Sequence, residues 1–305
     1  MQLKNREEKS LPIAIIISMF LWGLSWPSGK VLSRYCSVVN FSVYRYILVI
    51  ATLFISLPFM GVSLRVRKAG IPMFVMSGIL LSVYSYFFFV GIKLGTPGAG
   101  GVLVTTLNPI IAYAIGAALA RKIPGRKDIL GLALGLAACC VLLKAWDPAS
   151  TVSDSGNIYF LLAAFTWAVM SKFTAKGAQY GSSMGFSLWQ YIVTLACLTP
   201  LVNIQEFAAV FQVRDPVFWL NLIFGSVIVT AAATTMFFYS TTRIGAERAS
   251  SFIFLVPLCA ALSSFLFLGE QIHLNTAVGG GLGIGAVYLI NKKTKHAVGT
   301  VKKTD

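Results

Sequence analysis

The sequence predicts an all-α polytopic membrane protein with ten transmembrane helices arranged as two inverted five-helix repeats. Two features carry this prediction. Of the 305 residues, 57% are hydrophobic and only 11% are charged, a composition that water-soluble domains of this length do not have. The second feature is an internal duplication, in which the same side chains recur about 145 residues apart.

Ten apolar runs have roughly the length needed to cross a hydrocarbon core of about 30 Å. They cover residues 11–31, 41–60, 71–92, 98–120, 127–145, 157–178, 184–204, 216–241, 246–268 and 274–291. The connections between them are short, so there is no separate soluble domain. We therefore divide the chain into a cytoplasmic tail (1–10), a first five-helix repeat (11–145), a loop (146–156), a second five-helix repeat (157–291) and a basic cytoplasmic tail (292–305).

The net charge of +15 marks one side of the membrane. If the N-terminus is inside, nineteen of the 25 Lys and Arg residues fall on that side and five on the other. Cytoplasmic segments of membrane proteins carry such an excess, so we expect both termini to be cytoplasmic. The charge then needs no nucleic-acid partner. We expect an integral protein of a bacterial inner (plasma) membrane, a monomer or a homodimer in the lipid bilayer.

The duplication keeps its register through five consecutive helices. A shift of 145 residues places Phe20-Leu21-Trp22-Gly23 on Phe165-Thr166-Trp167-Ala168, and residues 41–47 on 186–192. Because each repeat has an odd number of crossings, the second repeat enters the membrane in the opposite orientation. The helices that carry the recurring residues are then expected to surround a site near the midplane of the membrane.

Proline interrupts the fourth and ninth apolar runs at matching depths, since a shift of 148 residues places Pro109 on Pro257. A proline inside a helix leaves the carbonyl of Thr105 without its usual N–H partner. Inside a bilayer such a carbonyl needs neighbouring helices, hydroxyl groups or a cavity, and Thr106 and Asn108 are also within reach. Paired interrupted helices point to a transporter's binding site. We assign Thr105, Asn108, Pro109 and Pro257 to the substrate pathway, with bending for helix packing as the alternative.

Two glycine pairs recur at the same shift of 148 residues, Gly131 with Gly135 and Gly279 with Gly283. Each pair is spaced by four residues and therefore lies on one face of its helix. Small residues at this spacing let helix backbones approach closely in membranes. We interpret all four glycines as structural.

These features resemble the EamA-like ten-helix branch of the drug/metabolite transporter superfamily. The resemblance rests on Trp22-Gly23, the aromatic-rich stretch 41–47 with its arginine, the two prolines, and Leu268-Gly269-Glu270 at the end of the ninth run. It covers the chain from about Ile13 to Ile290. It implies two inverted five-helix halves, a central cavity and alternating access. The sequence departs from it at Leu119-Ala120-Arg121-Lys122, where many relatives carry a Gly-Glu pair.

Five further side chains are candidates for the central site. Trp22 and Trp167 lie well inside their runs, where cavity lining is favoured over an interfacial aromatic belt. Tyr84 is the preferred cavity residue among the aromatic residues of the third run. Lys172 could receive a substrate carboxylate, with a solvated helix end as the alternative. Arg45 is expected to snorkel to the outer interface or pair with a helix end, and since its repeat partner is the neutral Gln190, a structural anchor is favoured, with a substrate ligand as the alternative.

The chain has no Asp or Glu in the middle of an apolar run, no nucleophile–base set and no metal-like spacing of His or Cys. We therefore expect no enzyme, no cofactor and no metal site. The leading hypothesis is a secondary transporter that exports small metabolites, with amino acids or similar neutral or zwitterionic compounds as first choice. The alternatives are a nucleotide-sugar or organic-anion transporter, and a membrane receptor or scaffold that kept the fold without transporting.

Overall fold

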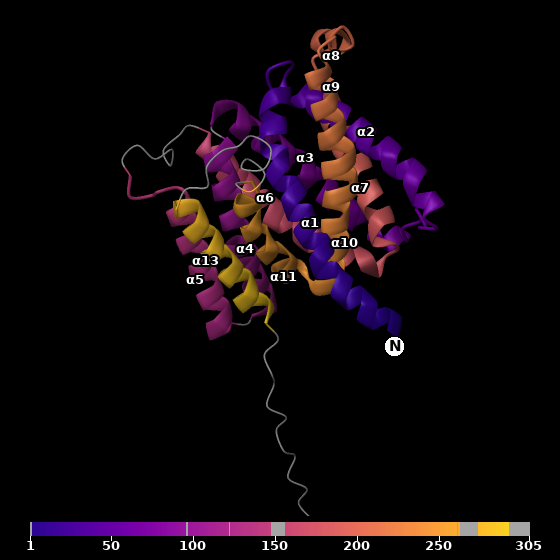
Figure 1. Cartoon of the computed structure of the whole chain (residues 1–305). Helices are drawn as coiled ribbons and strands as arrows, with labels where there is room; N and C mark the ends of the chain where they lie inside the picture. The colour runs from indigo at the N-terminus through magenta and orange to yellow at the C-terminus, as the bar shows by residue number, and fades with distance from the viewer. Residues whose placement is uncertain are drawn as a thin grey trace, which may run out of the picture.

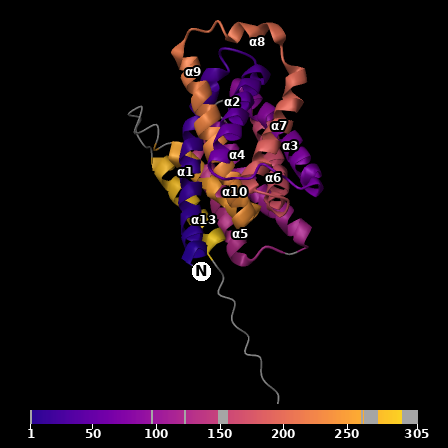
Figure 2. The ribbon, with the colours of Figure 1, turned by 90° about the vertical axis from the view of Figure 1, so that its right-hand side faces the viewer.

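The computed structural model describes residues 2–95, 97–121, 123–147, 156–260, 262 and 274–292. These residues form one bundle of helices (Figure 1). The N-terminus lies at one end of the bundle, and a short helix, α8 (Ile204–Val210), lies across the opposite end (Figure 2). We call these the N-terminal end and the α8 end. Lys122, His273 and the Leu268-Gly269-Glu270 segment lie outside the described residues.

The first half of the chain forms five helices in the order expected. They are α1 (Gln2–Leu32), α2 (Val38–Phe59), α3 (Ile71–Leu94), α4 (Pro97–Ala120) and α5 (Arg126–Leu142). α2 begins where the hydroxyl of Ser37 accepts a hydrogen bond from the backbone N–H of Asn40, which satisfies one of the donors left open at a helix start. α4 continues through Pro109 as one helix. The expected interruption therefore does not divide this helix.

The second half is less regular than the first. It contains α6 (Asn157–Lys176), α7 (Ser183–Leu198), α8, α9 (Pro216–Ile223), η5 (Phe224–Thr234), α10 (Thr235–Ile244), α11 (Ala246–Ser251), η6 (Phe252–Leu255), a helical stretch 256–260, and α13 (Leu274–Asn291). α9, η5 and α10 follow one another without a break and form a single span, Pro216–Ile244. η5 is a π-helix, and η6 is a 3₁₀ turn directly before the stretch that holds Pro257.

Seven helices of the described part are long and apolar enough to cross a membrane. They are the first four spans of the first half and the spans Asn157–Lys176, Ser183–Leu201 and Pro216–Ile244. The other three expected spans are shorter or incompletely described: α5 has 17 residues, α13 has 18, and the ninth run is described only as far as residue 260 and at residue 262. In the part that the structure describes, the chain is therefore an all-helical membrane protein.

Helices of the two halves pack against each other in matched pairs. α3 packs on α6, and the equivalent helices of the opposite halves, α1 and α9–η5–α10, also touch. The contact between α3 and α7 is matched by the contact between their equivalents, η5 and α2. The contact between α4 and α6 is matched by the contact between their equivalents, η6 and α1. The pairs α2 with α7 and α5 with α13 are their own counterparts. Exchanging the two halves therefore maps this set of neighbours onto itself.

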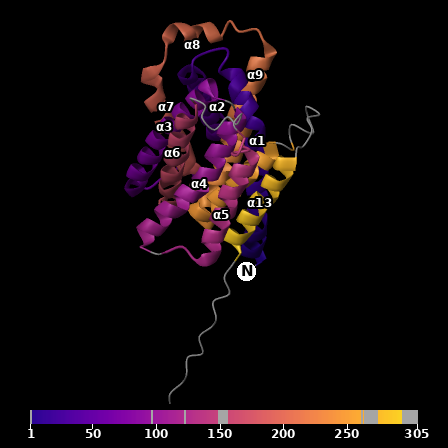
Figure 3. The same cartoon turned by 90° about the vertical axis from the view of Figure 1, so that its left-hand side faces the viewer.

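The recurring glycines lie where α5 and α13 come together, and these two helices lie side by side (Figure 3). A Cβ atom on Gly131 would approach the Ile290 side chain to 2.6 Å, and one on Gly279 would approach Leu142 to 2.6 Å. Gly135 and Gly283 instead face Phe254 of η6, with closest distances of 2.2 and 2.9 Å. These contacts leave no room for a side chain and bring α5, α13 and η6 together.

Gly23 provides a test of the packing between the halves. A Cβ atom there would lie 2.7 Å from the backbone nitrogen of Ala260, which cannot move aside as a flexible side chain could. We expect Gly23→Ala to destabilise the protein by about 1–3 kcal/mol, measured as a lower melting temperature in detergent. Gly281→Ala is the control, since nothing lies within 4 Å of the added atom, and this variant should be unchanged or slightly more stable. Equal melting temperatures for the two variants would contradict the close approach of α1 and residues 256–260.

Candidate functional site

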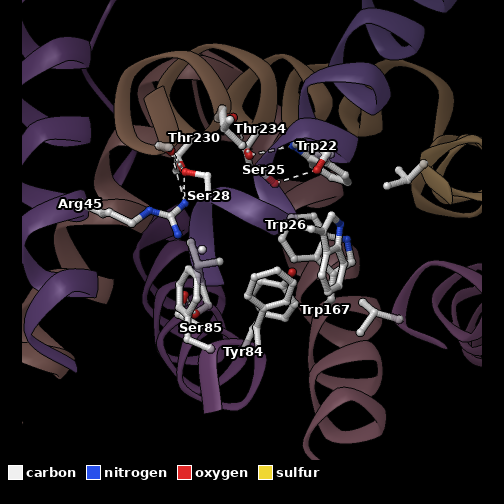
Figure 4. Close-up of a pocket in the computed structure, with 18 of the residues that line it drawn as sticks. Trp22, Ser25, Trp26, Ser28, Arg45, Tyr84, Ser85, Trp167, Thr230 and Thr234 are labelled. Carbon is white, nitrogen blue, oxygen red and sulfur yellow. Dashed lines mark hydrogen bonds between the residues drawn. The ribbon is translucent and has the colours of Figure 1, made fainter. Parts of the chain in front are cut away.

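A central cavity lies between the two halves of the bundle, with an empty volume of about 900 Å³ that includes its open part. It is bordered by α1, α2, α3, α4, α6, α7, η5, η6 and the start of the 256–260 stretch (Figure 4). The wall is mainly aromatic and aliphatic, with hydroxyl groups, one amide and one guanidinium.

Five of the eight predicted substrate-pathway residues line this cavity: Trp22, Tyr84, Thr105, Asn108 and Trp167. The other three, Pro109, Lys172 and Pro257, are not among the lining residues. The two prolines each follow a lining residue, Asn108 and Val256. Two polar side chains near Pro109 make hydrogen bonds within the protein. The Thr105 hydroxyl donates to the Gly101 carbonyl, and the Asn108 amide donates to the Ala164 carbonyl on α6.

The two tryptophans that the repeat relates to each other are in contact at one end of the cavity. The rings of Trp22 and Trp167 meet edge to face with centroids 5.3 Å apart. Phe237 packs on both, and Tyr84 packs on Trp167 with centroids 4.7 Å apart. The indole N–H of Trp22 donates to the Thr234 hydroxyl at 3.1 Å. Edge-to-face aromatic pairs of this kind have a preferred geometry, so the cluster is a well-defined boundary of the cavity.

The π-helix η5 was not predicted from the sequence, and it forms one wall of the cavity. Its residues Gly225, Val229, Thr230 and Thr234 line the space. In a π-helix backbone bonds reach five residues back, and here the hydroxyls of Thr230 and Thr234 also donate to carbonyls five residues earlier, those of Gly225 and Val229. Such segments occur often at functional sites. The wider turn places hydroxyl groups and backbone carbonyls along the cavity.

Arg45, which the sequence analysis interpreted as a structural anchor, lies in the cavity wall. One terminal nitrogen of its guanidinium donates to the Thr230 hydroxyl at 2.8 Å and to the Gly225 carbonyl at 3.3 Å. The guanidinium also lies over the Phe89 ring, 4.8 Å from its centroid. These partners are in the interior of a helix, not at a helix end. The repeat partner Gln190 is fully buried and faces Thr174 and Met170 instead, so the two positions have different surroundings.

Lys172 forms an ion pair with Glu247 of α11. The pair lies against Gly116 of α4, because a Cβ atom there would approach both charged groups to within 2.8 Å. Lys172 is five residues beyond Trp167 on α6, roughly 7.5 Å along the helix axis, and the cavity ends at Trp167. The ammonium of Lys172, which was a candidate for binding a substrate carboxylate, is therefore paired with a carboxylate of the protein. This ion pair brings α4, α6 and α11 together.

The α8 end is held by polar and aromatic contacts. Tyr44 stacks on Phe207 of α8 with centroids 4.2 Å apart and an interplanar angle of 3°, and its hydroxyl donates to the Phe207 carbonyl. The Tyr35 hydroxyl donates to the carboxylate of Asp215, which raises the pKa of Tyr35. The same bond, together with the backbone N–H of Val217, lowers the pKa of Asp215. These contacts join α8 and the start of α9 to the segment around the start of α2.

Three buried side-chain atoms at the cavity have no hydrogen-bond partner among the described residues: Nε of Arg45, Oδ1 of Asn108 and Nε1 of Trp167. Most buried polar atoms in proteins are paired, so an unpaired one calls for an explanation such as a bound molecule or water. The three atoms offer one charged donor, one acceptor and one neutral donor. They are the groups that a polar ligand in this cavity could engage.

An all-helical membrane bundle with a polar–aromatic cavity between its halves defines a membrane protein built around a small-molecule site. The chain belongs to the EamA-like transporter family, whose model matches residues 10–144 and 154–292. The resemblance to the drug/metabolite transporter superfamily is thereby confirmed. The family indicates a small-molecule transporter of the membrane rather than an enzyme.

Individual relatives are distant but span nearly the whole chain. An uncharacterized transporter of Bacillus subtilis is 23% identical over 96% of this chain and 95% of its own length. A probable amino-acid metabolite efflux pump of Salmonella typhimurium is 22% identical, covering 93% and 95%. A probable terminal-alkyne amino-acid exporter of Streptantibioticus cattleyicolor is 24% identical, covering 92% and 93%. A crystal structure that is 17% identical superposes with a TM-score of 0.69 over 93% of this chain and 96% of that one, which shows a shared fold.

The Lys172–Glu247 pair can be tested by a double-mutant cycle. Lys172→Met and Glu247→Gln should each lower the melting temperature, and the double variant should lose less than the sum of the two. Contacting pairs couple by roughly 0.5–3 kcal/mol, and we expect the lower part of this range because the Glu247 side chain is 35% exposed. Lys68→Met, at an exposed position, is the control. Additive losses would mean that the pair contributes nothing to stability.

Proposed function

We propose that this chain is a secondary transporter that exports small metabolites, with amino acids or similar neutral or zwitterionic compounds as substrates. The observation that carries the proposal is the cavity at the interface of the two halves, which holds unpaired polar atoms between aromatic walls. Substrate would bind there while the two halves rock against each other, so that the cavity opens to one side at a time. The relatives named as amino-acid exporters support this substrate class.

The neighbours shared between the halves support an inverted ten-helix arrangement. Two five-helix repeats related by a pseudo-two-fold axis would produce a set of contacts that is unchanged when the halves are exchanged, as observed here. In this arrangement the repeats comprise residues 11–145 and 157–291. Trp22 and Trp167, which contact each other, would lie close to the axis.

The charge distribution orients the cavity. With both termini cytoplasmic, the N-terminal end is the cytoplasmic end. The cavity residues of α1 lie between Trp22 and Leu32, in the part of the helix farthest from the N-terminus. The cavity therefore extends from the tryptophan contact toward the outer side. The Lys172–Glu247 pair lies on the cytoplasmic side of that contact, and its separation would accompany opening toward the cytoplasm.

Transport by purified protein in liposomes tests the proposal. We expect the wild type to exchange at least one member of a panel of amino acids and small metabolites. Trp167→Phe and Asn108→Leu, which keep approximate size, should lower the initial rate about tenfold, the effect of roughly 1.4 kcal/mol on a barrier. Phe54→Leu is the control, since Phe54 is 61% exposed on the outside of the bundle. Failure of the wild type to move any compound in either direction would overturn the transporter assignment.

The two prolines are proposed to act as hinges at the edge of the site. Replacing both by alanine would restore the missing backbone bonds, so the double variant should insert normally but transport more slowly. Pro257→Ala alone should have the larger effect, because Pro257 follows the irregular segment η6 while α4 continues through Pro109. The measurement is the initial transport rate at matched protein level. An unchanged rate in the double variant would reduce the prolines to packing residues.

A further inference from the structure

Arg45 is a cation that faces the cavity without a counter-charge in the described structure. The salt bridge between Lys172 and Glu247 is the ion pair found in the described residues, and no carboxylate lines the cavity. Arg45 is half-buried on α2, with Tyr46, Ser85 and Phe89 among the other lining residues. A guanidinium cannot lose its charge in a protein, so its burial favours an anion beside it.

The guanidinium has hydrogen-bond donors left over. It carries five N–H groups in a planar fork. The bonds it makes to described residues, to Thr230 and to Gly225, both start from the same terminal nitrogen. The Nε–H is buried and has no partner there. The contact with Phe89 holds the planar group in place and takes up none of these donors. The remaining donors, the Nε–H and the two N–H groups of the other terminal nitrogen, can each donate a charge-assisted hydrogen bond to a carboxylate oxygen.

Two other cations on the cavity helices, Lys172 and Lys30, are already engaged. Lys172 is paired with Glu247. Lys30, on α1, donates to the carbonyls of Ile92, Lys93 and Gly95 at distances from 2.7 to 3.2 Å and so caps the end of α3. Arg45 alone among the three keeps donors that no described group uses. The cavity thus presents one uncompensated positive charge, which matches a single carboxylate and not a substrate with several phosphates.

Beside the guanidinium the wall is not overpacked. A Cβ atom on Gly225 would make only ordinary van der Waals contacts, 3.7 Å from the Arg45 Nε, 3.9 Å from its Cζ and 4.0 Å from the Ser28 hydroxyl. Figure 4 shows the guanidinium directed toward Ser28 and Thr230, with Trp22 and Trp167 on the other side of the cavity. On the wall formed by α4, the Asn108 amide donates to Ala164, so its Oδ1 remains as an unpaired acceptor.

We propose that Arg45 binds the carboxylate of the substrate, and that the Asn108 Oδ1 accepts a hydrogen bond from its protonated amine. The substrate class is then small molecules with one carboxylate and one ammonium group. This proposal rests on the proposed function and narrows it, because it makes Arg45 a substrate ligand and makes the carboxylate a requirement. An ammonium in this cavity would also face the aromatic rings of Trp22 and Tyr84, which attract cations.

The test uses the purified full chain and two matched sets of probes, the twenty common amino acids and their carboxamides. Binding is measured by the shift in melting temperature and transport by exchange in liposomes. Wild type should bind and carry members of the first set and not their carboxamides. Arg45→Gln should weaken binding of those amino acids about 30-fold or more. Arg45→Lys, which keeps the charge without the fork, should lose less.

A second variant separates a binding role from a structural one. Ser28→Asp would supply a carboxylate of the protein next to Arg45, and Ser28→Asn is its uncharged match. If Arg45 needs a counter-ion, Ser28→Asp should keep or raise the melting temperature while binding of amino acids is lost. Ser28→Asn, which adds similar bulk without the charge, should lose less binding than Ser28→Asp. If Arg45 only supports η5, the two variants should bind alike.

The outcomes distinguish this proposal from the proposed function. Equal binding of acids and carboxamides, or wild-type binding by Arg45→Gln with a normal melting temperature, overturns the carboxylate site. The carboxylate site is also overturned if the wild type transports only amines or neutral compounds and no carboxylate. In that case the transporter assignment stands. If nothing is transported but amino acids still stabilise the wild type and not Arg45→Gln, the proposed function fails and the carboxylate site stands.

Discussion

Polar groups inside the hydrocarbon region must find partners within the protein, and this constraint organises the bundle. Within regular helices the backbone satisfies itself, and hydroxyl side chains bond to carbonyls of their own helix, as Ser85 does to Leu81 and Ser171 to Trp167. The π-turns of η5 depart from this pattern. Some of their polar groups accept hydrogen bonds from another helix, since the Gly225 carbonyl and the Thr230 hydroxyl both accept from the Arg45 guanidinium on α2. Polar groups are thereby concentrated at the centre, where lipid does not reach.

The internal duplication was the most informative feature of the sequence. It brought the equivalent positions Trp22 and Trp167 to attention, and in the structure their rings touch and both border the cavity. Thr105, Asn108 and Tyr84 were also found from local reasoning, because intramembrane polar and aromatic side chains favour cavity positions over lipid. The first five helices were predicted nearly to their ends, except that α1 begins at Gln2, within the predicted tail 1–10, since a long apolar run bounded by charged or turn residues leaves few alternatives.

Other parts of the site have no signature in a single sequence. A π-helix has no distinct composition, and a π-turn shifts which residues of a span face inward, so the wall made by Gly225, Thr230 and Thr234 was missed. The same wall explains why Arg45 was interpreted as an anchor: its partners lie 180 and 185 residues away. Lys172 was considered for substrate because its ion-pair partner, Glu247, is 75 residues away and just past a turn. Pairings of this kind depend on the packing of distant helices.

The two charged sites differ in a way that suits alternating access. On the side of the tryptophan contact toward the N-terminal end, Lys172 and Glu247 form an ion pair between α4, α6 and α11, so these two charges need no ligand to balance them. On the other side Arg45 has no counter-charge in the described structure. A ligand can shift a conformational equilibrium only by binding one state better than the other. Because the compensated pair lies outside the cavity and the uncompensated cation lies in its wall, a carboxylate would act on Arg45 without competing with Glu247. In the proposed transporter, substrate binding and closure at the N-terminal end would therefore depend on separate charges, with the aromatic contact between Trp22 and Trp167 between them.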